Sequence, residues 1–415
     1  MTIESLKTVV TARPITPAAS IPESSPRYAG WRVVAACYLA ALCCWGFGLY
    51  GHGVYLTELN RLHGWPTALI SGAVTCFYLL TAALVVFISD AIARLGPRRV
   101  MLIGACSFGG AVALLAFVDA IWQLYLVYTL MAVGAATMHV GAISTVVGLW
   151  FDKKRPLAIS LALNGASSGG IFITPPLVLA IAAYGFSNAI LGATLVMAAV
   201  LLPAIALWIR RPAITAAKTG PTAAAVAWTR RSALRSAKFW SVAAPFALAL
   251  TAQVGFLVHQ IAIVEPVLGR AQVGFSVAAL TITAVLGRFG LGAFANRLDM
   301  RRFAAWSVAS QAVALLVLTA AGHPAAIVAV CVLFGLSAGN LLTLPALVIQ
   351  REFDAASFSL LVGLSWAISQ FTYAFGPGLV GVIRDVTGSY SVSLVLLAGL
   401  DLAAAALVLL RPAAR

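Results

Sequence analysis

Charged residues are scarce in this chain, and acidic residues are the scarcest of them. The 415 residues include only 12 Asp and Glu against 27 Lys and Arg, and charged residues make up 9% of the sequence. Soluble domains carry about 25% charged residues. Apolar residues reach 62%, and the mean hydropathy is +0.99. These values exclude an ordinary soluble globular domain and indicate an integral membrane protein.

Cysteine is too scattered to build a covalent or metal framework. All six cysteines fall inside apolar runs, without a CxxC pair or the spacing of metal ligands, so we expect them to pack as small residues. We therefore expect no disulfide, no metal site and no cofactor. The sequence also lacks a serine or cysteine nucleophile motif with a positioned histidine, which argues against an intramembrane hydrolase and predicts that the chain is not an enzyme.

Apolar runs of about 20 residues, the length that spans a bilayer as a helix, recur along the whole chain. They are continuous and rich in Ala, Leu, Val and Gly, which predicts helices with internally satisfied backbone groups. The expected fold class is an all-α polytopic membrane protein with twelve transmembrane helices. The runs cover residues 32–56, 68–93, 100–118, 121–150, 157–182, 186–209, 239–263, 273–296, 303–321, 324–349, 356–383 and 389–410.

The basic residues are distributed unevenly between the loops. If the N-terminus is cytoplasmic, the odd-numbered loops hold only Arg61, Arg270 and Arg384, and Arg288 lies within the membrane. The other Lys and Arg residues all face the cytoplasm, which predicts cytoplasmic termini. Their contact with anionic lipids accounts for the net charge of +15. We expect no nucleic-acid partner, because no soluble domain surrounds these residues.

Arg288 lies deep inside an apolar run. It precedes Arg297, the next charged residue, by nine residues, or roughly 13 Å of helix, which places it near the middle of the membrane. A guanidinium there costs about 3 to 15 kcal/mol unless a cavity or a partner receives it. Thr281, Ala284 and Gly292 share its helical face and leave room around it. The chain is therefore expected to have a hydrated interior.

The segment from Arg94 to Arg99 recurs 203 residues later as Arg297 to Arg302. This repeat predicts two six-helix halves with a substrate path between them. We expect a cytoplasmic tail at residues 1–30, bundles at 31–209 and 239–411, and a basic linker at 210–238. Within the linker, Val226 to Trp240 can form a basic amphipathic helix on the membrane surface. Residues 1–30 lack the apolar core of a signal peptide, so the first span is expected to direct insertion.

The loop after the second run resembles the signature loop of the major facilitator superfamily, Gly-x-x-x-Asp-Arg-x-Gly-x-Arg-Arg, although Ala93 stands in the aspartate position. Such loops either anchor helices at the anionic leaflet or act as a conformational latch. The resemblance implies two six-helix bundles that alternate access to a central site. It assigns a gating role to loop residues of both repeats: Asp90, Arg94, Gly96, Arg98, Arg99, Asn296, Arg297, Arg301 and Arg302.

A closer resemblance is to the monocarboxylate and oxalate/formate transporters. It is carried by Gly30-Trp31, Leu149 to Ala158, Asn164 to Gly170 and Gly376 to Gly381. Arg288 precedes the helix-eight glycines as in monocarboxylate transporters, although Ala284 replaces their acidic residue. The resemblance implies a secondary active transporter of a small organic anion, a mono- or dicarboxylate, working by proton symport or anion exchange. The alternative is a proton-coupled exporter of a drug-like or other small solute.

Ten polar or aromatic residues within the spans are candidates for the substrate site. Arg288 is expected to bind the substrate carboxylate, because its fork matches that group. The histidines could instead carry a coupled proton, and each candidate could serve only in helix packing. Asp401 has no evident partner. The candidates are Arg288, His52, Asn164, His139, Gln253, His259, Asn340, Trp366, Gln370 and Tyr373. We expect a monomer in a bacterial inner membrane, with anionic lipids as neighbours.

Overall fold

The computed structural model describes residues 22–211, 228–294, 297–354 and 356–412, and within these ranges the chain is helical and contains no strand. Ten helical stretches are long and apolar enough to cross a membrane. The expected ninth and eleventh spans correspond to two further stretches, the more polar α13 (Met300–Leu318) and the interrupted pair α16 (Phe358–Tyr373) and α17 (Gly376–Thr387). The expected all-helical fold is confirmed.

The first six spans contain the elements up to α9. The first span begins as α1, passes through a π-helical turn, η1, and continues as α2. The fourth span is divided into α5 and α6, and the fifth into α7 and α8. The bounds are α1 Gly30–Trp45, η1 Gly46–Tyr50, α2 Gly51–His63, α3 Thr67–Leu95, α4 Pro97–Leu114, η2 Leu115–Phe117, α5 Ile121–Met138, α6 Val140–Gly148, α7 Arg155–Phe172, α8 Thr174–Tyr184 and α9 Phe186–Trp208.

The second six spans follow a short helix, α10 (Arg230–Arg235). The amphipathic helix expected up to Trp240 is not continuous, because Ser236 is extended and the seventh span starts immediately after it; Val226 lies outside the described residues. The remaining bounds are α11 Ala237–Leu268, α12 Val273–Phe294, α14 Pro324–Leu341, α15 Leu344–Glu352 and α18 Ser391–Val408.

The helix interruptions repeat in the two halves with nearly the same spacing as the loop motif. The fourth span breaks at His139 and the tenth at Leu342, which lies 203 residues later. The fifth span breaks at Ile173 and the eleventh at Ala374 and Phe375. A proline in the first turn follows three of these four breaks, because proline fits a helix start and not its interior. Broken helices at matching positions point to a transport path between the halves.

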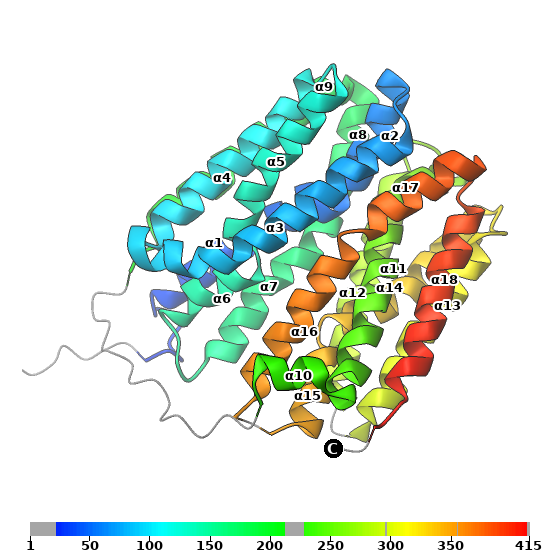
Figure 1. Ribbon diagram of the computed structural model, residues 1–415. Coiled ribbons are helices and arrows are strands. Elements are labelled where there is room, and N and C mark those ends of the chain that lie inside the picture. The colour runs from blue at the N-terminus through cyan, green and yellow to red at the C-terminus, as the bar shows by residue number, and fades with distance from the viewer. Residues whose placement is uncertain (1–21, 212–227, 295–296, 355, 413–415) are drawn as a thin grey trace, which may run out of the picture.

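The two groups of six spans lie side by side (Figure 1). We call the end where α1 begins and α18 ends the near end, and the opposite end the far end. Large apolar side chains cover the outer surface; Val386 is 81% exposed and Trp306 is 78% exposed. Such a surface suits contact with lipid chains.

Candidate functional site

Arg288 bridges the two halves of the molecule. Its Nε donates to the Gly339 carbonyl on α14, at 3.2 Å, and its Nη2 donates to Ser167 Oγ on α7, at 3.4 Å. The residue is half-buried, and no Asp or Glu among the described residues forms an ion pair with it. Its Nη1 donates no hydrogen bond to that part of the chain. A guanidinium with donors to spare therefore lies where the halves meet.

Glycines on α12 and α14 bring Arg288 to its carbonyl partner. A Cβ added at Gly339 would lie 1.9 Å from the Ala284 carbonyl oxygen, and one added at Gly287 would lie 2.1 Å from the Leu336 oxygen. Only helices without side chains at these points can approach so closely. Ala284 replaces an acid expected one turn before Arg288, and its backbone instead packs on Gly339.

The opposite wall of the site comes from α7, which packs closely on α1. A Cβ at Gly165 would lie 2.1 Å from the Tyr38 carbonyl oxygen. The Tyr38 hydroxyl bonds to Ser168 Oγ at 2.7 Å, and Ser168 bonds back to the Asn164 carbonyl at 3.0 Å. Asn164 is half-buried on this helix, one turn from Ser167, the residue that receives Arg288. Gly170 allows close contact with Thr281 of α12.

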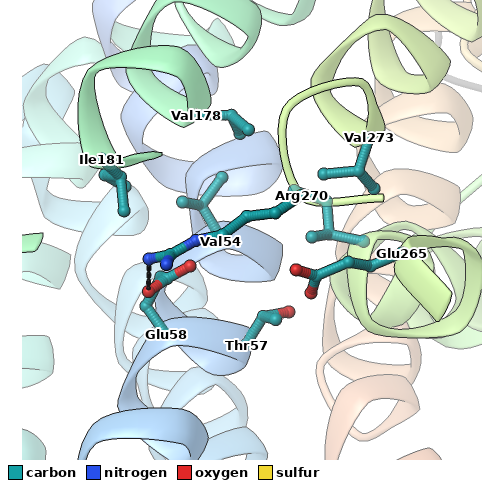
Figure 2. A pocket seen from close by; sticks show the side chains of 9 residues that line it. Val54, Thr57, Glu58, Val178, Ile181, Glu265, Arg270 and Val273 are labelled. Atoms are coloured by element: carbon teal, nitrogen blue, oxygen red, sulfur yellow. Dashed lines mark hydrogen bonds and ion pairs between the residues drawn. The ribbon is translucent and has the colours of Figure 1, made fainter. Parts of the chain in front are cut away.

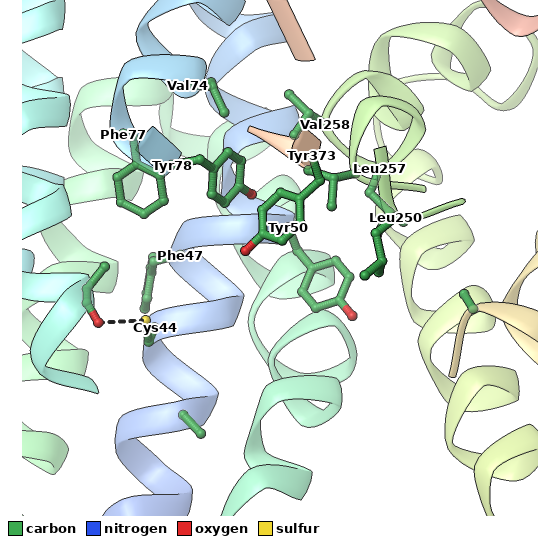
Figure 3. Packing of buried hydrophobic residues seen from close by; sticks show 14 of the residues in the cluster. Cys44, Phe47, Tyr50, Val74, Phe77, Tyr78, Leu250, Leu257, Val258 and Tyr373 are labelled. Carbon is green, nitrogen blue, oxygen red and sulfur yellow. Dashed lines mark hydrogen bonds between the residues drawn. The ribbon is translucent and has the colours of Figure 1, made fainter. Parts of the chain in front are cut away.

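A tyrosine cluster lies beside the arginine and was not among the sequence candidates, apart from Tyr373. Tyr50 ends the π-helical turn η1 and lies close enough to Arg288 for its phenol to feel the arginine charge. Tyr78 of α3 meets Tyr373 of α16 edge-on across the halves, with ring centroids 5.5 Å apart. Figure 3 shows Tyr50, Tyr78 and Tyr373 in one part of the interior. Single π-helical turns are frequent at functional sites, and the Gly46-Phe47-Gly48 run was the available signal.

The three histidines within the spans occupy three different environments. His52 is fully buried among aromatic rings, with Phe77 at 4.7 Å and Tyr128 stacked at 5.2 Å, and neither ring nitrogen has a hydrogen-bond partner. His139 lies at the break between α5 and α6, and its ring stacks on Trp45 with the ring centroids 5.4 Å apart. His259 is fully buried within the second half, bonded to Pro377 and Tyr390. The structure therefore does not bring the histidines together.

Three of the remaining candidates each have one buried side-chain atom that lacks a hydrogen-bond partner. Gln253 Oε1, Asn340 Oδ1 and Gln370 Nε2 are buried atoms without a hydrogen-bond partner in the structure. Asn340 follows Gly339, the acceptor of Arg288, and its Nδ2 bonds to the Leu336 carbonyl within its own helix. Trp366 is half-buried and packs against the core.

The loop residues of the two repeats have different surroundings. Asp90, Arg94, Arg98 and Arg99 are exposed, and Gly96 has a φ of 89°, the left-handed backbone that the turn requires. In the second copy, Arg297 and Arg302 are exposed but Arg301 is fully buried. Asn296 lies outside the described residues.

Asp299 caps α13 by accepting from the backbone amides of Arg301 and Arg302. Burial would raise the pKa of Asp299, but hydrogen bonds from the Arg302 amide and the Arg411 side chain outweigh it and lower the pKa. The carboxylate therefore stays charged at neutral pH, and its contribution to helix stability is lost only as the pH falls through this lowered value.

Ion pairs close the far end of the molecule across the two halves. Glu58 of α2 accepts from Arg270 at 2.7 Å, and Arg61 of α2 bonds to Glu265 of α11 at 2.6 Å and to Glu58 at 2.6 Å. Figure 2 shows Arg270 reaching Glu58 from the second half, with Glu265 beside them. Arg384, the third arginine of the odd-numbered loops, pairs with Asp385 at 3.1 Å. All three of these arginines are thus compensated by acids.

The fold is that of a polytopic helical membrane protein with two groups of six spans, and a guanidinium lies where the two groups meet. Within the described residues, no group of three or more His, Cys, Asp or Glu could hold a metal ion. The family model of the Major Facilitator Superfamily matches residues 37–377. The chain belongs to this superfamily, and the relatives and structural neighbours found for it are transporters rather than enzymes.

Several characterised and uncharacterised transporters are similar to parts of the chain. The human Monocarboxylate transporter 12 is 25% identical over 169 residues, which cover 39% of this chain and 31% of that protein. The Uncharacterized transporter ESBP6 of Saccharomyces cerevisiae is 29% identical over 150 residues, or 34% of this chain and 21% of that protein. The chain therefore spans less than half of the length of these relatives.

Solved structures match the fold over most of the chain. A bacterial homologue of the human lysosomal transporter Spinster, in an inward-facing and unoccupied conformation, has a TM-score of 0.70 at 15% identity and covers 92% of this chain and 95% of its own. The nucleoside transporter NupG has a TM-score of 0.69 at 12% identity, and the match covers 91% of this chain and 98% of that chain. At these identities the match establishes the fold alone.

Proposed function

We propose that this protein is a secondary active transporter that moves a small organic anion, a mono- or dicarboxylate, by alternating access. The observation that carries the proposal is Arg288, a half-buried guanidinium between the halves with no acid paired to it among the described residues. The names of the human and rodent monocarboxylate transporters among its relatives agree with this substrate class.

The bonding of Arg288 suits an incoming carboxylate. Its present partners are a carbonyl and a hydroxyl, which leave the positive charge uncompensated. A carboxylate can accept two parallel N–H bonds from the guanidinium fork and neutralise it where water is scarce. The phenol of Tyr50, which lies close enough to feel the charge of Arg288, would supply a further donor to the anion.

We further propose that residues 31–209 and 239–411 rock against each other around this site, with the near end in the cytoplasm. Nearly all basic loop residues lie at the near end, where anionic lipids would meet them. On this orientation, the far-end ion pairs lie on the external side and would hold that side closed. We place the protein in a bacterial inner membrane, as a monomer, with proton symport or anion exchange as the driving mechanism.

An exporter of drug-like solutes is the weaker alternative. Such a transporter would be expected to place a carboxylate in the path between the halves. Asp401, the acid deepest in a span, is fully buried in α18 against the second half, and both its oxygens lack hydrogen-bond partners. It therefore does not face the path.

Arg288→Lys and Arg288→Gln test the substrate site. Lysine keeps the charge but loses the planar fork, so we expect carboxylate affinity to fall about tenfold or more in the lysine variant, and further in the glutamine variant. The measurement is carboxylate binding and counterflow with purified protein in liposomes, over a panel of short mono- and dicarboxylates. Arg32→Lys, an exposed change on α1 at the near end, serves as the control. Wild-type affinity in the glutamine variant would remove Arg288 from the site.

The orientation is tested with single cysteines in a background without native cysteine. Leu62 is 55% exposed at the far end, and Arg302 has a side chain 79% exposed at the near end. An impermeant thiol reagent should label Leu62→Cys in intact cells and spare Arg302→Cys until the cells are opened. The reverse pattern would invert the topology.

A further inference from the structure

A polar chamber lies between the halves at the far end, next to the ion pairs. It has a volume of about 480 Å³, within the range of small-ligand sites. Its lining includes Arg61 and Thr67 from the first half, and Glu265, Arg384 and Tyr390 from the second. A chamber with these side chains will hold water.

Tyr390 connects this chamber to a buried histidine. The ring of His259 is fully buried, with Nε2 at 3.0 Å from the Pro377 carbonyl oxygen and Nδ1 at 3.3 Å from the Tyr390 hydroxyl. A carbonyl can only accept, so Nε2 carries the hydrogen. In the neutral ring Nδ1 is then a free lone pair, which accepts from the phenol. His259 thus presents one basic nitrogen, and the group touching it borders the chamber.

The other titratable and charged groups near His259 are few. Arg384 and Asp385 act on the ring with opposite sign from α17, and they pair with each other. Glu265 lies on α11 itself and lines the chamber, while α3 contributes Thr67, which lines the same chamber as Tyr390. Asp401, the ionisable residue of α18, makes no hydrogen bond in the structure.

Pro377 links the histidine to the contact between the halves. It lies in the first turn of α17, whose next residue, Gly378, donates its amide to Thr75 of α3 at 3.2 Å. At the far end of α17, Asp385 accepts from the Ala68 amide at 2.7 Å. The segment of the second half that His259 holds is therefore bonded to the first half at both of its ends.

We propose that His259 is a proton-binding site that is filled from the far-end chamber through Tyr390. The charge state of His259 controls closure of the far end through Pro377 and α17. The proposal rests on the proposed transport function and names the proton as the coupling ion. A hydronium in the chamber gives its proton to the Tyr390 oxygen while the phenol proton passes to Nδ1. Water and a neutral phenol remain, and the ring becomes a cation that donates to both Pro377 and Tyr390.

Tyr390→Phe removes the relay oxygen and keeps the ring, so it is the informative variant. The measured quantity is a ratio in liposomes, the rate of carboxylate uptake driven by a pH gradient divided by the rate of counterflow without a gradient. This ratio should fall about tenfold or more in Tyr390→Phe and in His259→Gln. His63→Gln is the matched control, because His63 stacks on Trp65 outside this network, and it should keep the wild-type ratio. An unchanged ratio in Tyr390→Phe would overturn the proposal.

A second measurement needs no substrate. A cysteine at Thr57, which lines the chamber, is labelled by a thiol reagent between about pH 5 and 8, the range in which histidine titrates. The labelling rate at Thr57→Cys is divided by the labelling rate of Leu62→Cys, which corrects for the change in thiolate fraction with pH. The ratio should change with pH in the otherwise unaltered chain and be flat in Tyr390→Phe. If the labelling ratio is independent of pH in both chains, the proton site is rejected. If the ratio depends on pH but the protein shows no carboxylate counterflow, only the proposed substrate is rejected.

Discussion

Arg301 is a fully buried arginine that ties the near end of the second half together. Its Nε and Nη2 bond to the two oxygens of Glu352, at 2.6 and 2.8 Å, and its Nη1 bonds to the carbonyls of Val408 and Leu410. Both the Ser241 carbonyl and hydroxyl also accept from it. Arg98, the equivalent residue of the first repeat, is exposed. The same position in the duplicated loop is therefore structural in one half and solvated in the other.

At the residue scale, Arg301→Lys should destabilise the protein far more than Arg98→Lys. Lysine keeps the charge but cannot make the forked contact, and the acceptors that it leaves unpaired should cost about 1 to 3 kcal/mol. The exposed position should change by no more than about 0.5 kcal/mol. The midpoint of thermal unfolding in detergent measures the difference. Equal midpoints for the two variants would contradict the role given to Arg301.

At the scale of elements, the pair α12 and α14 positions Arg288 through backbone contact. The two helices touch at Gly287, Gly335 and Gly339, where any side chain would collide with a carbonyl of the other helix. This closeness lets a helix carbonyl reach Arg288 in place of an acid.

Gly287→Ala and Gly290→Ala form a matched test in the same helix. A Cβ at Gly287 would lie 2.1 Å from the Leu336 oxygen, whereas nothing lies within 4 Å of one at Gly290. Overpacking should cost about 1 to 3 kcal/mol at Gly287, and alanine should gain up to about 1 kcal/mol at Gly290 through helix propensity. We expect carboxylate affinity to fall only in Gly287→Ala. Comparable thermal midpoints and affinities in both variants would argue against close packing at this crossing.

At the scale of the whole molecule, the described structure is joined across the halves by hydrogen bonds at its middle and far end. Arg288 to Ser167 lies in the middle, and the pairs of Glu58 with Arg270 and Arg61 with Glu265 lie at the far end. The arginines are partly exposed, with side-chain exposures of 39% and 42%, so each pair contributes only about 0.5 to 1 kcal/mol. Weak pairs of this kind can be broken and remade during transport.

The double variant Arg270→Gln and Glu265→Gln removes both cross-half pairs, keeps the net charge and leaves Glu58 paired with Arg61. The free energy that favours the closed far end should fall by about 1 to 2 kcal/mol, which should raise the labelling rate of a cysteine at Thr57 roughly 5- to 30-fold. Asp119→Asn, an exposed far-end change outside the network, is the control. A rate that stays at the control value would show that the ion pairs do not hold the far end closed.

The sequence by itself determined the properties that depend on local composition. Run lengths predicted the spans, the 203-residue offset predicted two repeated halves, and the distance from Arg288 to the next charge predicted a position deep in the membrane. These features follow from hydropathy and helical rise, which need no knowledge of neighbouring helices. The helix bounds agree with the predicted spans, with the first span extending further than expected, to His63.

Tertiary structure decided what depends on the rotation and contacts of each helix. Sequence could not separate His259, hydrogen-bonded beside the chamber, from His52, enclosed in aromatic rings without a partner. Nor could it distinguish buried Arg301 from exposed Arg98, which stand at the same position of one repeated motif. The physical reason is that a polar side chain in a span takes its role from the groups that other helices bring to it, and those groups are distant in sequence.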